Sequence, residues 1–159
     1  MRFISHRGNL DGTHRNLENM PAQIDEAISL GFDVEIDLWL HNESLYLGHD
    51  RPEHETSDRF LIDRSSSLWI HAKSVDTVSF LLRSDLNWFW HESDKFTLTS
   101  KGIPWSFPEI FFESCVVNQP NDGSKFWTER LHEKMNFHAI CHDDIMRVKR
   151  RLSQNEQTF

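Results

Sequence analysis

Hydrophobic and polar residues alternate regularly in residues 32–50, FDVEIDLWLHNESLYLGHD. Three aliphatic residues occupy alternate positions, and the carboxylates of Glu35 and Asp37 lie between them. Successive side chains of a strand point to opposite faces, so this pattern predicts a strand with one apolar and one acidic face.

A short hairpin is predicted directly after this strand. The polar residues 41–44 form the turn, and the apolar residues 45–47 form the returning strand. That return brings His49 and Asp50 close to the two carboxylates. Other elements of the chain are arranged around this hairpin.

The residue pattern of the N-terminal part predicts a βαβ unit, which favours a parallel sheet. Residues 3–6 form a strand, residues 9–19 form a Gly/Asn/Asp-rich loop, and helix 20–31 leads into the acidic strand. We expect Asn19 to be the N-cap of this helix, and Pro21 suits its first turn because its missing N–H costs little there.

The rest of the chain continues this alternation, after a polar and irregular stretch at 51–67 with one helical turn at 59–63. Further strands are predicted at 68–73, 87–91, 114–118 and 137–141. Helices are predicted at 74–84, 124–133 and 143–152. Ser74 is the expected cap of the first of these helices, and Asp143 or Asp144 caps the last.

Residues 96–99 and 103–107 both have the composition of strands, but only three residues separate them. A parallel crossover needs about a dozen residues or more, whereas three residues suit a hairpin. Either this segment is a local antiparallel excursion or one barrel strand is lost here.

The length of 159 residues predicts a single domain, 1–159. The formal net charge of -8, without a basic stripe, argues against a nucleic-acid partner or an anionic membrane surface. No apolar run has the length of a signal peptide or a membrane span, so we expect a cytoplasmic protein. Cys115 and Cys141 are then reduced core thiols, unless adjacent strands let them pair.

Glu35 and Asp37 are the first candidate site residues. Two carboxylates on one strand face repel each other unless a cation lies between them. Oxygen ligands of this kind suit Mg²⁺ or Ca²⁺. The alternative is a solvated strand face.

Four short motifs resemble the glycerophosphodiester phosphodiesterase family, in the same order and strand context over residues 1–50. They are HRG at residues 6–8, EN at 18–19, E-x-D at 35–37 and HD at 49–50. The resemblance implies a TIM-type (β/α) barrel and a small-molecule phosphodiester substrate. A full barrel of this type has about 250 residues, so we expect a compact, parallel-rich version that lacks some helices or a strand in its second half.

The resemblance also implies roles for individual residues. His6 and His49 become the catalytic acid and base, since imidazole titrates near neutral pH, although the spacing does not say which is which. Arg7 and Lys73 would bind the substrate phosphate. The nucleophile is either water or a neighbouring hydroxyl of the substrate, which would give a cyclic phosphate first.

Position 71 departs from the family. The third strand of the family carries E-x-K, and this chain has His71-Ala72-Lys73. His71 is therefore either a third metal ligand beside Glu35 and Asp37 or a hydrogen-bonded barrel histidine. Imidazole suits Mn²⁺ or Zn²⁺ better than Mg²⁺ or Ca²⁺, so the identity of the divalent ion is open.

Other residues have two interpretations each. His91 faces the barrel mouth or is a core histidine, and Asp50 orients a neighbour or touches the metal. The tryptophans at 39, 69 and 105 pack in the core or line the pocket, and the His-Asp-Asp run at 142–144 is most simply a helix cap.

Two functions remain. One is a metal-dependent phosphodiesterase, and the other is a non-catalytic module that binds a phosphorylated ligand on the same barrel. Retention of both candidate acid–base histidines favours the enzyme.

Overall fold

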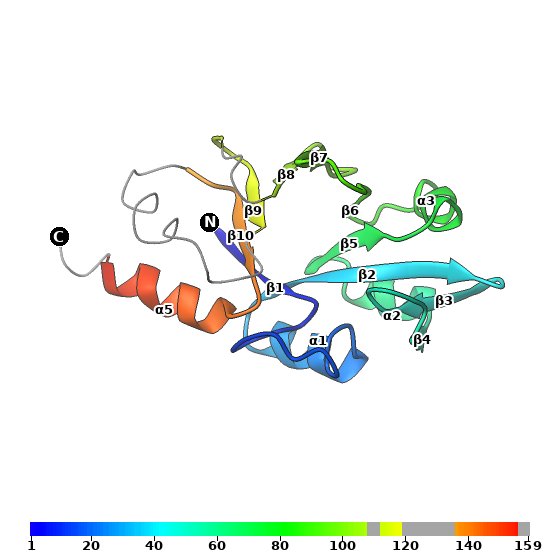
Figure 1. Cartoon of the computed structure of the whole chain (residues 1–159), viewed down its shortest axis with the longest axis horizontal. Coiled ribbons are helices and arrows are strands. Elements are labelled where there is room, and N and C mark those ends of the chain that lie inside the picture. Colours follow the sequence, from blue (N-terminus) through cyan, green and yellow to red (C-terminus); the bar gives the residue numbers. More distant parts are fainter. Residues whose placement is uncertain (108–111, 119–135, 156–159) are drawn as a thin grey trace.

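Ten strands form one sheet in the computed structural model, which describes residues 1–107, 112–118 and 136–155. Seven of them run parallel in the order β6-β5-β2-β1-β10-β9-β8. Their bounds are β1 Arg2–His6, β2 Asp33–His41, β5 Leu68–Ala72, β6 Trp88–Phe89, β8 Pro104–Ser106, β9 Val116–Asn118 and β10 Ala139–His142. The end strands β6 and β8 do not pair through the described residues, so the parallel-rich sheet forms a partial TIM-like barrel (Figure 1).

Three further strands are antiparallel. β3 (Ser44–Leu47) and β4 (His54–Thr56) extend β2 as a meander, and β7 (Phe96–Leu98) pairs with β8. The antiparallel interpretation of residues 96–107 is therefore confirmed. Strand β4 lies in the stretch that we predicted to be irregular, and its three residues carry no apolar alternation that would have indicated a strand.

Four helices are described: α1 (Pro21–Ser29), α2 (Asp58–Asp63), α3 (Val75–Leu81) and α5 (Ile145–Asn155). Helix α1 packs on β2, α3 on β2 and β5, and α5 on β1 and β10. Ser74 caps α3 as predicted, because its side chain accepts a hydrogen bond from the backbone N–H of Thr77. The predicted helix at 124–133 lies outside the described residues. In the part of the chain that is described, no helix has the length and apolar character of a membrane span.

The predicted cap of α1 is wrong. The N-cap is Met20, which makes no side-chain capping bond, and Asn19 lies just before it with a φ of 60°. Asn tolerates this left-handed conformation better than most residues. The Asn19 amide instead donates to the Asp37 carboxylate and accepts from the Asp37 backbone N–H, so the site and not the helix determines this position.

Apolar side chains cover both faces of the sheet. The outer face packs beneath the helices through the aliphatic residues of β2, as the alternation predicted. The inner, concave face is filled by Trp69, Phe89 and Trp105, whose rings stack or tilt against one another at centroid distances of 4.4–5.8 Å. Trp69 and Trp105 are thus core residues and do not line the pocket. Cys115 and Cys141 are buried free thiols, as expected.

Candidate active site

The polar ends of three neighbouring parallel strands meet at one edge of the sheet. His6 on β1 lies beside Glu35 on β2, and Asp37 on β2 lies beside His71 on β5. All four side chains point to the concave face, because the residues that alternate with them along β2 and β5 pack in the outer core. This is the edge formed by the carboxyl ends of the strands, where TIM-type barrels carry their functional residues.

Asp37 is the most heavily contacted group of the site. Its Oδ1 lies 3.0 Å from His71 Nδ1 and 3.3 Å from Lys73 Nζ. Its Oδ2 lies 3.0 Å from Arg7 Nε and 3.2 Å from His49 Nδ1. Burial alone would raise the pKa of Asp37, but the hydrogen bonds from both histidines and the two cationic charges outweigh it. The pKa of this carboxyl is therefore held well below its usual range.

The pKa of Glu35, two residues away, is shifted in the opposite direction. Burial, and then the negative charge of Asp37, raise the pKa of Glu35. His6 Nε2 lies 3.9 Å from Glu35 Oε2, and that oxygen has no hydrogen-bond partner among the described residues. An unpartnered buried carboxylate oxygen is costly, so this atom is suited to a cation that approaches from the concave side.

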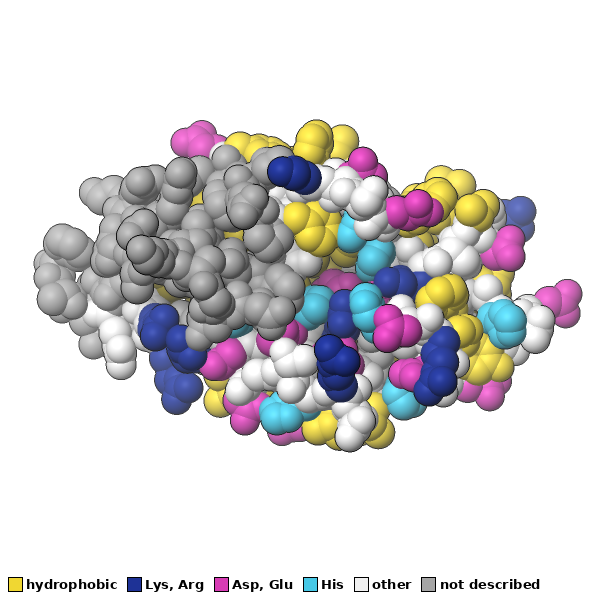
Figure 2. Space-filling view, in the orientation of Figure 1, with side chains coloured by type: hydrophobic (Ala, Val, Ile, Leu, Met, Phe, Trp, Pro, Cys, Tyr) yellow, Lys and Arg dark blue, Asp and Glu magenta, His cyan; other side chains and the backbone are white. Residues whose placement is uncertain are grey.

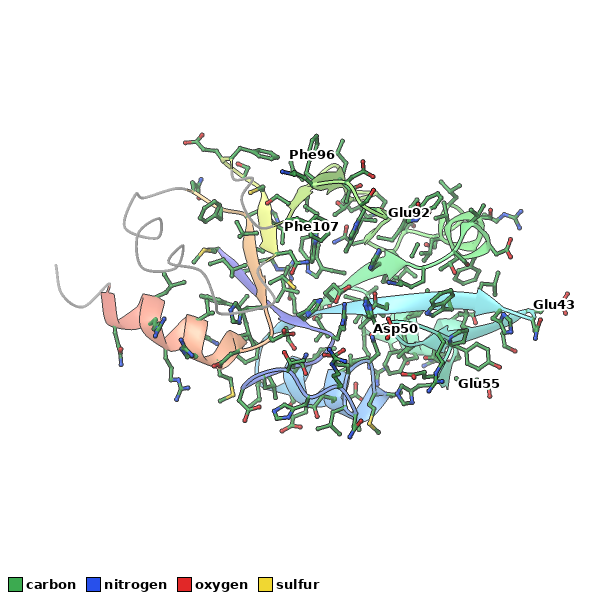
Figure 3. The ribbon with its side chains drawn as sticks, in the orientation of Figure 1. Glu43, Asp50, Glu55, Glu92, Phe96 and Phe107 are labelled. Carbon is green, nitrogen blue, oxygen red and sulfur yellow. The ribbon has the colours of Figure 1, made fainter. Side chains whose placement is uncertain are left out.

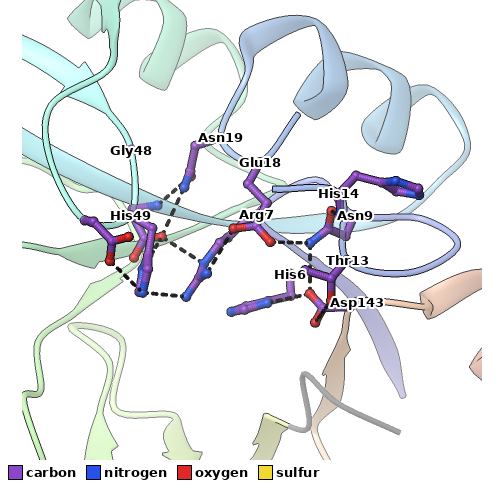
Figure 4. Close-up of polar contacts among 12 residues, drawn as sticks. His6, Arg7, Asn9, Thr13, His14, Glu18, Asn19, Gly48, His49 and Asp143 are labelled. Atoms are coloured by element: carbon purple, nitrogen blue, oxygen red, sulfur yellow. Dashed lines mark hydrogen bonds and ion pairs between the residues drawn. The ribbon is translucent and has the colours of Figure 1, made fainter. Parts of the chain in front are cut away.

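His6 is held by Asp143, a residue that the sequence interpretation assigned only to a helix cap. Asp143 Oδ1 lies 2.7 Å from His6 Nδ1, and the carboxylate also accepts from Asn9 Nδ2 and Thr13 Oγ1, each at 2.9 Å (Figure 4). Burial lowers the pKa of His6, but the hydrogen bond to Asp143 and the charge of Glu35 outweigh it, so the pKa of His6 is raised. Conversely, the hydrogen bonds to His6 and its neighbours outweigh burial and lower the pKa of Asp143.

Asp144, the next residue, is the one that caps α5, because its Oδ1 accepts from the backbone N–H of Arg147 at 3.1 Å. The order of the strands in the sheet explains the role of Asp143. Because β10 is parallel to β1, the residue that follows β10 lies at the same edge of the sheet as His6.

Arg7 spans the middle of the site. Its guanidinium contacts Glu18 Oε2 at 3.0 Å, Asp37 Oδ2 at 3.0 Å and His49 Nε2 at 3.3 Å (Figure 4). The backbone of Arg7 has a φ of 55°, which is uncommon for a residue with a Cβ. Such a conformation persists only where the surrounding contacts hold it, and here those contacts are the groups of the site.

His49 reaches the site from the loop after the β2–β3 hairpin. Gly48 makes this possible: its φ is 150°, and a Cβ at this position would collide with the backbone oxygen of Arg51. The His49 ring is 39% exposed and joins Asp37 to Arg7. Figure 3 shows Glu43 at the far tip of the hairpin and Asp50 near the centre of the molecule. The Asp50 side chain is 93% exposed, with one oxygen 3.6 Å from His49 Nε2, so it lies at the rim.

Several of these groups line an open cleft of about 870 Å³. It is lined by His6, Arg7, Thr13, Arg15, Glu18, His49, Asp50, Glu53 and Asp143. Figure 2 shows histidine, basic and acidic side chains gathered together on this face of the molecule. Of the residues predicted from sequence, His6, Arg7 and His49 line the cleft. Glu35, Asp37, His71 and Lys73 are not among the lining residues, although Lys73 contacts Asp37.

A hollow of about 990 Å³ lies elsewhere, between α2, α3 and the tip of the hairpin. Its floor includes Leu61, Phe80 and Leu86, and none of the candidate catalytic or metal-ligating residues borders it. The candidate catalytic residues His6 and His49 therefore border the polar cleft and not this hollow.

A divalent ion fits the donors beside this cleft. Glu35, Asp37 and His71 each offer one ligand atom, and these three atoms lie within 4.8 Å of one another. The unpartnered Glu35 Oε2 is one of the atoms that such an ion would satisfy. Two carboxylates and one imidazole are a donor set that divalent metals accept.

His91 lies at the edge of the same region, stacked on His71 with ring centroids 4.5 Å apart. Burial, together with the charges of His71 and Lys73, lowers the pKa of His91 to about 4. At neutral pH it is therefore an uncharged packing partner of His71.

Comparisons with known proteins identify the fold. No family model matches the chain, and a search of curated proteins finds no similar sequence. Among solved structures, the chain is similar to a glycerophosphodiester phosphodiesterase from Parabacteroides distasonis ATCC 8503. The TM-score is 0.56 and the identity is 10%, and the match covers 98% of each chain. At this identity the likeness establishes the α/β, partial-barrel fold.

Proposed function

We propose that this chain is a metal-dependent phosphodiesterase that cleaves a small, glycerophosphodiester-like substrate. The protein would act as a single domain, 1–159, on a compact TIM-type barrel. The observation that carries the proposal is the placement of His6 and His49 on either side of the Glu35–Asp37 pair. The fold shared with a glycerophosphodiester phosphodiesterase supports it.

Charge neutralisation is the first requirement for cleaving a phosphodiester. Glu35 and Asp37, with His71 as third ligand, would hold a divalent ion, either Mg²⁺ or Ca²⁺ or, with the imidazole, Mn²⁺ or Zn²⁺. When bound, the ion would offset the negative charge of the phosphate. Arg7 and Lys73 would supply further positive charge to the substrate oxygens.

Proton transfer is assigned to the two histidines. His49 Nδ1 faces the ionised Asp37 and its Nε2 faces the Arg7 guanidinium, which can only donate, so Nε2 carries a lone pair and would act as the base. His6 has its Nδ1 engaged by Asp143, which leaves Nε2 for the reaction. The raised pKa of His6 keeps it protonated nearer neutral pH, which suits a general acid.

The proposed step moves one proton at each histidine. His49 Nε2 takes the proton of the nucleophile, which is water or a neighbouring substrate hydroxyl, as its oxygen bonds to phosphorus. The bond between phosphorus and the leaving oxygen breaks, and His6 Nε2 delivers its proton to that oxygen. Water attack gives a phosphomonoester and an alcohol directly, whereas hydroxyl attack gives a cyclic phosphate and an alcohol.

The test compares His6→Ala and His49→Ala with His41→Ala, which removes an exposed imidazole at the distant end of β2. On an unactivated diester, each site variant should lose about 10²–10⁴ in rate, and His41→Ala should match the wild type. On bis(4-nitrophenyl) phosphate, whose leaving group needs no acid, His6→Ala should recover and His49→Ala should not. Near wild-type rates for both site variants on the unactivated diester would refute the assignment.

The alternative is a module that binds a phosphorylated ligand without turning it over. One observation favours it: His71 stands where the resembled family has a carboxylate. In that case the chain would bind a phosphodiester with the same dependence on Arg7 and Lys73, but no product would form with any added metal ion.

A further inference from the structure

The inference concerns which metal ion the proposed site selects, and it rests on the proposed function. His71 is held rigidly. Its ring stacks on Phe89 at a centroid distance of 5.1 Å and on His91 at 4.5 Å, with interplanar angles of 6° and 4°. Its side chain is only 11% exposed. The imidazole is thus a fixed nitrogen donor at the end of β5.

Both ring nitrogens of His71 face hydrogen-bond acceptors. Nδ1 lies 3.0 Å from Asp37 Oδ1, and Nε2 lies 3.4 Å from the backbone oxygen of His91. Without a metal ion, Nδ1 donates to the Asp37 carboxylate. A bound ion would replace that hydrogen and leave the N–H on Nε2, towards the His91 carbonyl. A histidine that ligates a metal through one nitrogen commonly donates its other N–H to a backbone carbonyl in this way.

The hydrogen bond between His71 and Asp37 leaves the buried Glu35 Oε2 without a partner. A divalent ion would bind one atom from each of Glu35, Asp37 and His71, which the structure brings within 4.8 Å of one another.

We propose that His71 is a direct nitrogen ligand and that it makes this site select a transition-metal ion such as Mn²⁺ or Zn²⁺ over Mg²⁺ and Ca²⁺. Mg²⁺ and Ca²⁺ prefer all-oxygen sites, whereas imidazole suits the later divalent ions. The rigid stacking of the ring strengthens this selection, since the nitrogen cannot swing aside to let water take its place.

The experiment uses the full chain, stripped with a chelator and reloaded with Mn²⁺. Pulsed electron paramagnetic resonance detects a ¹⁴N nucleus bonded to Mn²⁺ directly, without any substrate. We expect ¹⁴N modulation in the wild type and in His41→Glu, the matched control on an exposed histidine. In His71→Glu the modulation should vanish while Mn²⁺ still binds. Competition titrations should show the preference for Mn²⁺ over Mg²⁺ falling by about tenfold or more in His71→Glu.

Each other outcome has a definite meaning. Bound Mn²⁺ without ¹⁴N modulation in the wild type would overturn the inference but leave the carboxylate site and the proposed function standing. Modulation that persists in His71→Glu would assign the nitrogen to another histidine and also overturn it. If neither ion binds the wild type better than Glu35→Gln/Asp37→Asn does, the proposed function fails as well. Should His71→Glu not fold, His71→Gln removes the same nitrogen without adding a charge.

Discussion

Replacing Asp143 by asparagine removes a charge from beneath His6 with almost no change in shape. The carboxylate accepts three hydrogen bonds, from His6, Asn9 and Thr13. The net contribution of a hydrogen bond to stability is about 1.5–3 kcal/mol when one group is charged and about 0.5–1.5 kcal/mol when both groups are neutral. Since the new amide oxygen still accepts from His6 but without charge, we expect a loss of about 1–1.5 kcal/mol in the free energy of unfolding where His6 is protonated.

The cost of Asp143→Asn depends on pH, and two pKa shifts determine in which direction. The pKa of His6 is raised in the folded chain, so its contribution to stability is complete below its unfolded pKa and is lost as pH rises through the folded value. The pKa of Asp143 is lowered, so its contribution is present above its unfolded pKa and is lost as pH falls through the folded value. The cost of Asp143→Asn should therefore be largest at about pH 5–6, and smaller in both stronger acid and alkali.

Urea denaturation of the chelated chain at several pH values measures this cost. Asp144→Asn is the matched control, because Asn caps a helix as well as Asp does and should cost little at any pH. A cost for Asp143→Asn that is flat with pH, or that grows towards alkaline pH, would rule out the charged pairing of Asp143 with His6.

Three further predictions concern the supports of the site. Asn19→Ala should cost about 2–3 kcal/mol in urea unfolding, because it removes two hydrogen bonds to Asp37 and places Ala at positive φ; a cost below about 0.5 kcal/mol would contradict it. Ser74→Ala should cost about 1 kcal/mol through loss of the cap on the Thr77 N–H, whereas Ser74→Asp should cost little. The imidazole of His91 should titrate by NMR near pH 4 in the metal-free chain, and a midpoint near the ordinary value of about 6.5 would show that it is not packed as described.

The sequence predicted the parts of the fold in which local pattern and tertiary position agree. The alternation in β2 and β5 correctly placed Glu35, Asp37, His71 and Lys73 on one face. A strand with one apolar face leaves little choice of orientation, so this prediction needed no knowledge of neighbouring strands.

The errors occurred where a distant contact determines the local structure. Asn19 has the composition of a helix cap, yet its side chain is bound by Asp37, eighteen residues away. Asp143 also looked like a cap, and only the pairing of β10 with β1 brings it to His6. The sequence did not decide whether Trp69 and Trp105 pack in the core or line the pocket, because this depends on how far the sheet curves. That curvature depends on contacts between strands that are far apart in the sequence.

The central claim is that the two histidines and the carboxylate pair together cleave a phosphodiester. Phosphorus NMR of an unactivated glycerophosphodiester, incubated with the full chain and Mn²⁺ or Mg²⁺, tests it most directly. The account predicts that the diester resonance is replaced by a phosphomonoester or cyclic phosphate resonance, and that His6→Ala and His49→Ala each abolish the change over the same time. An unchanged diester resonance with the wild type and every divalent ion, although the diester binds, would contradict it.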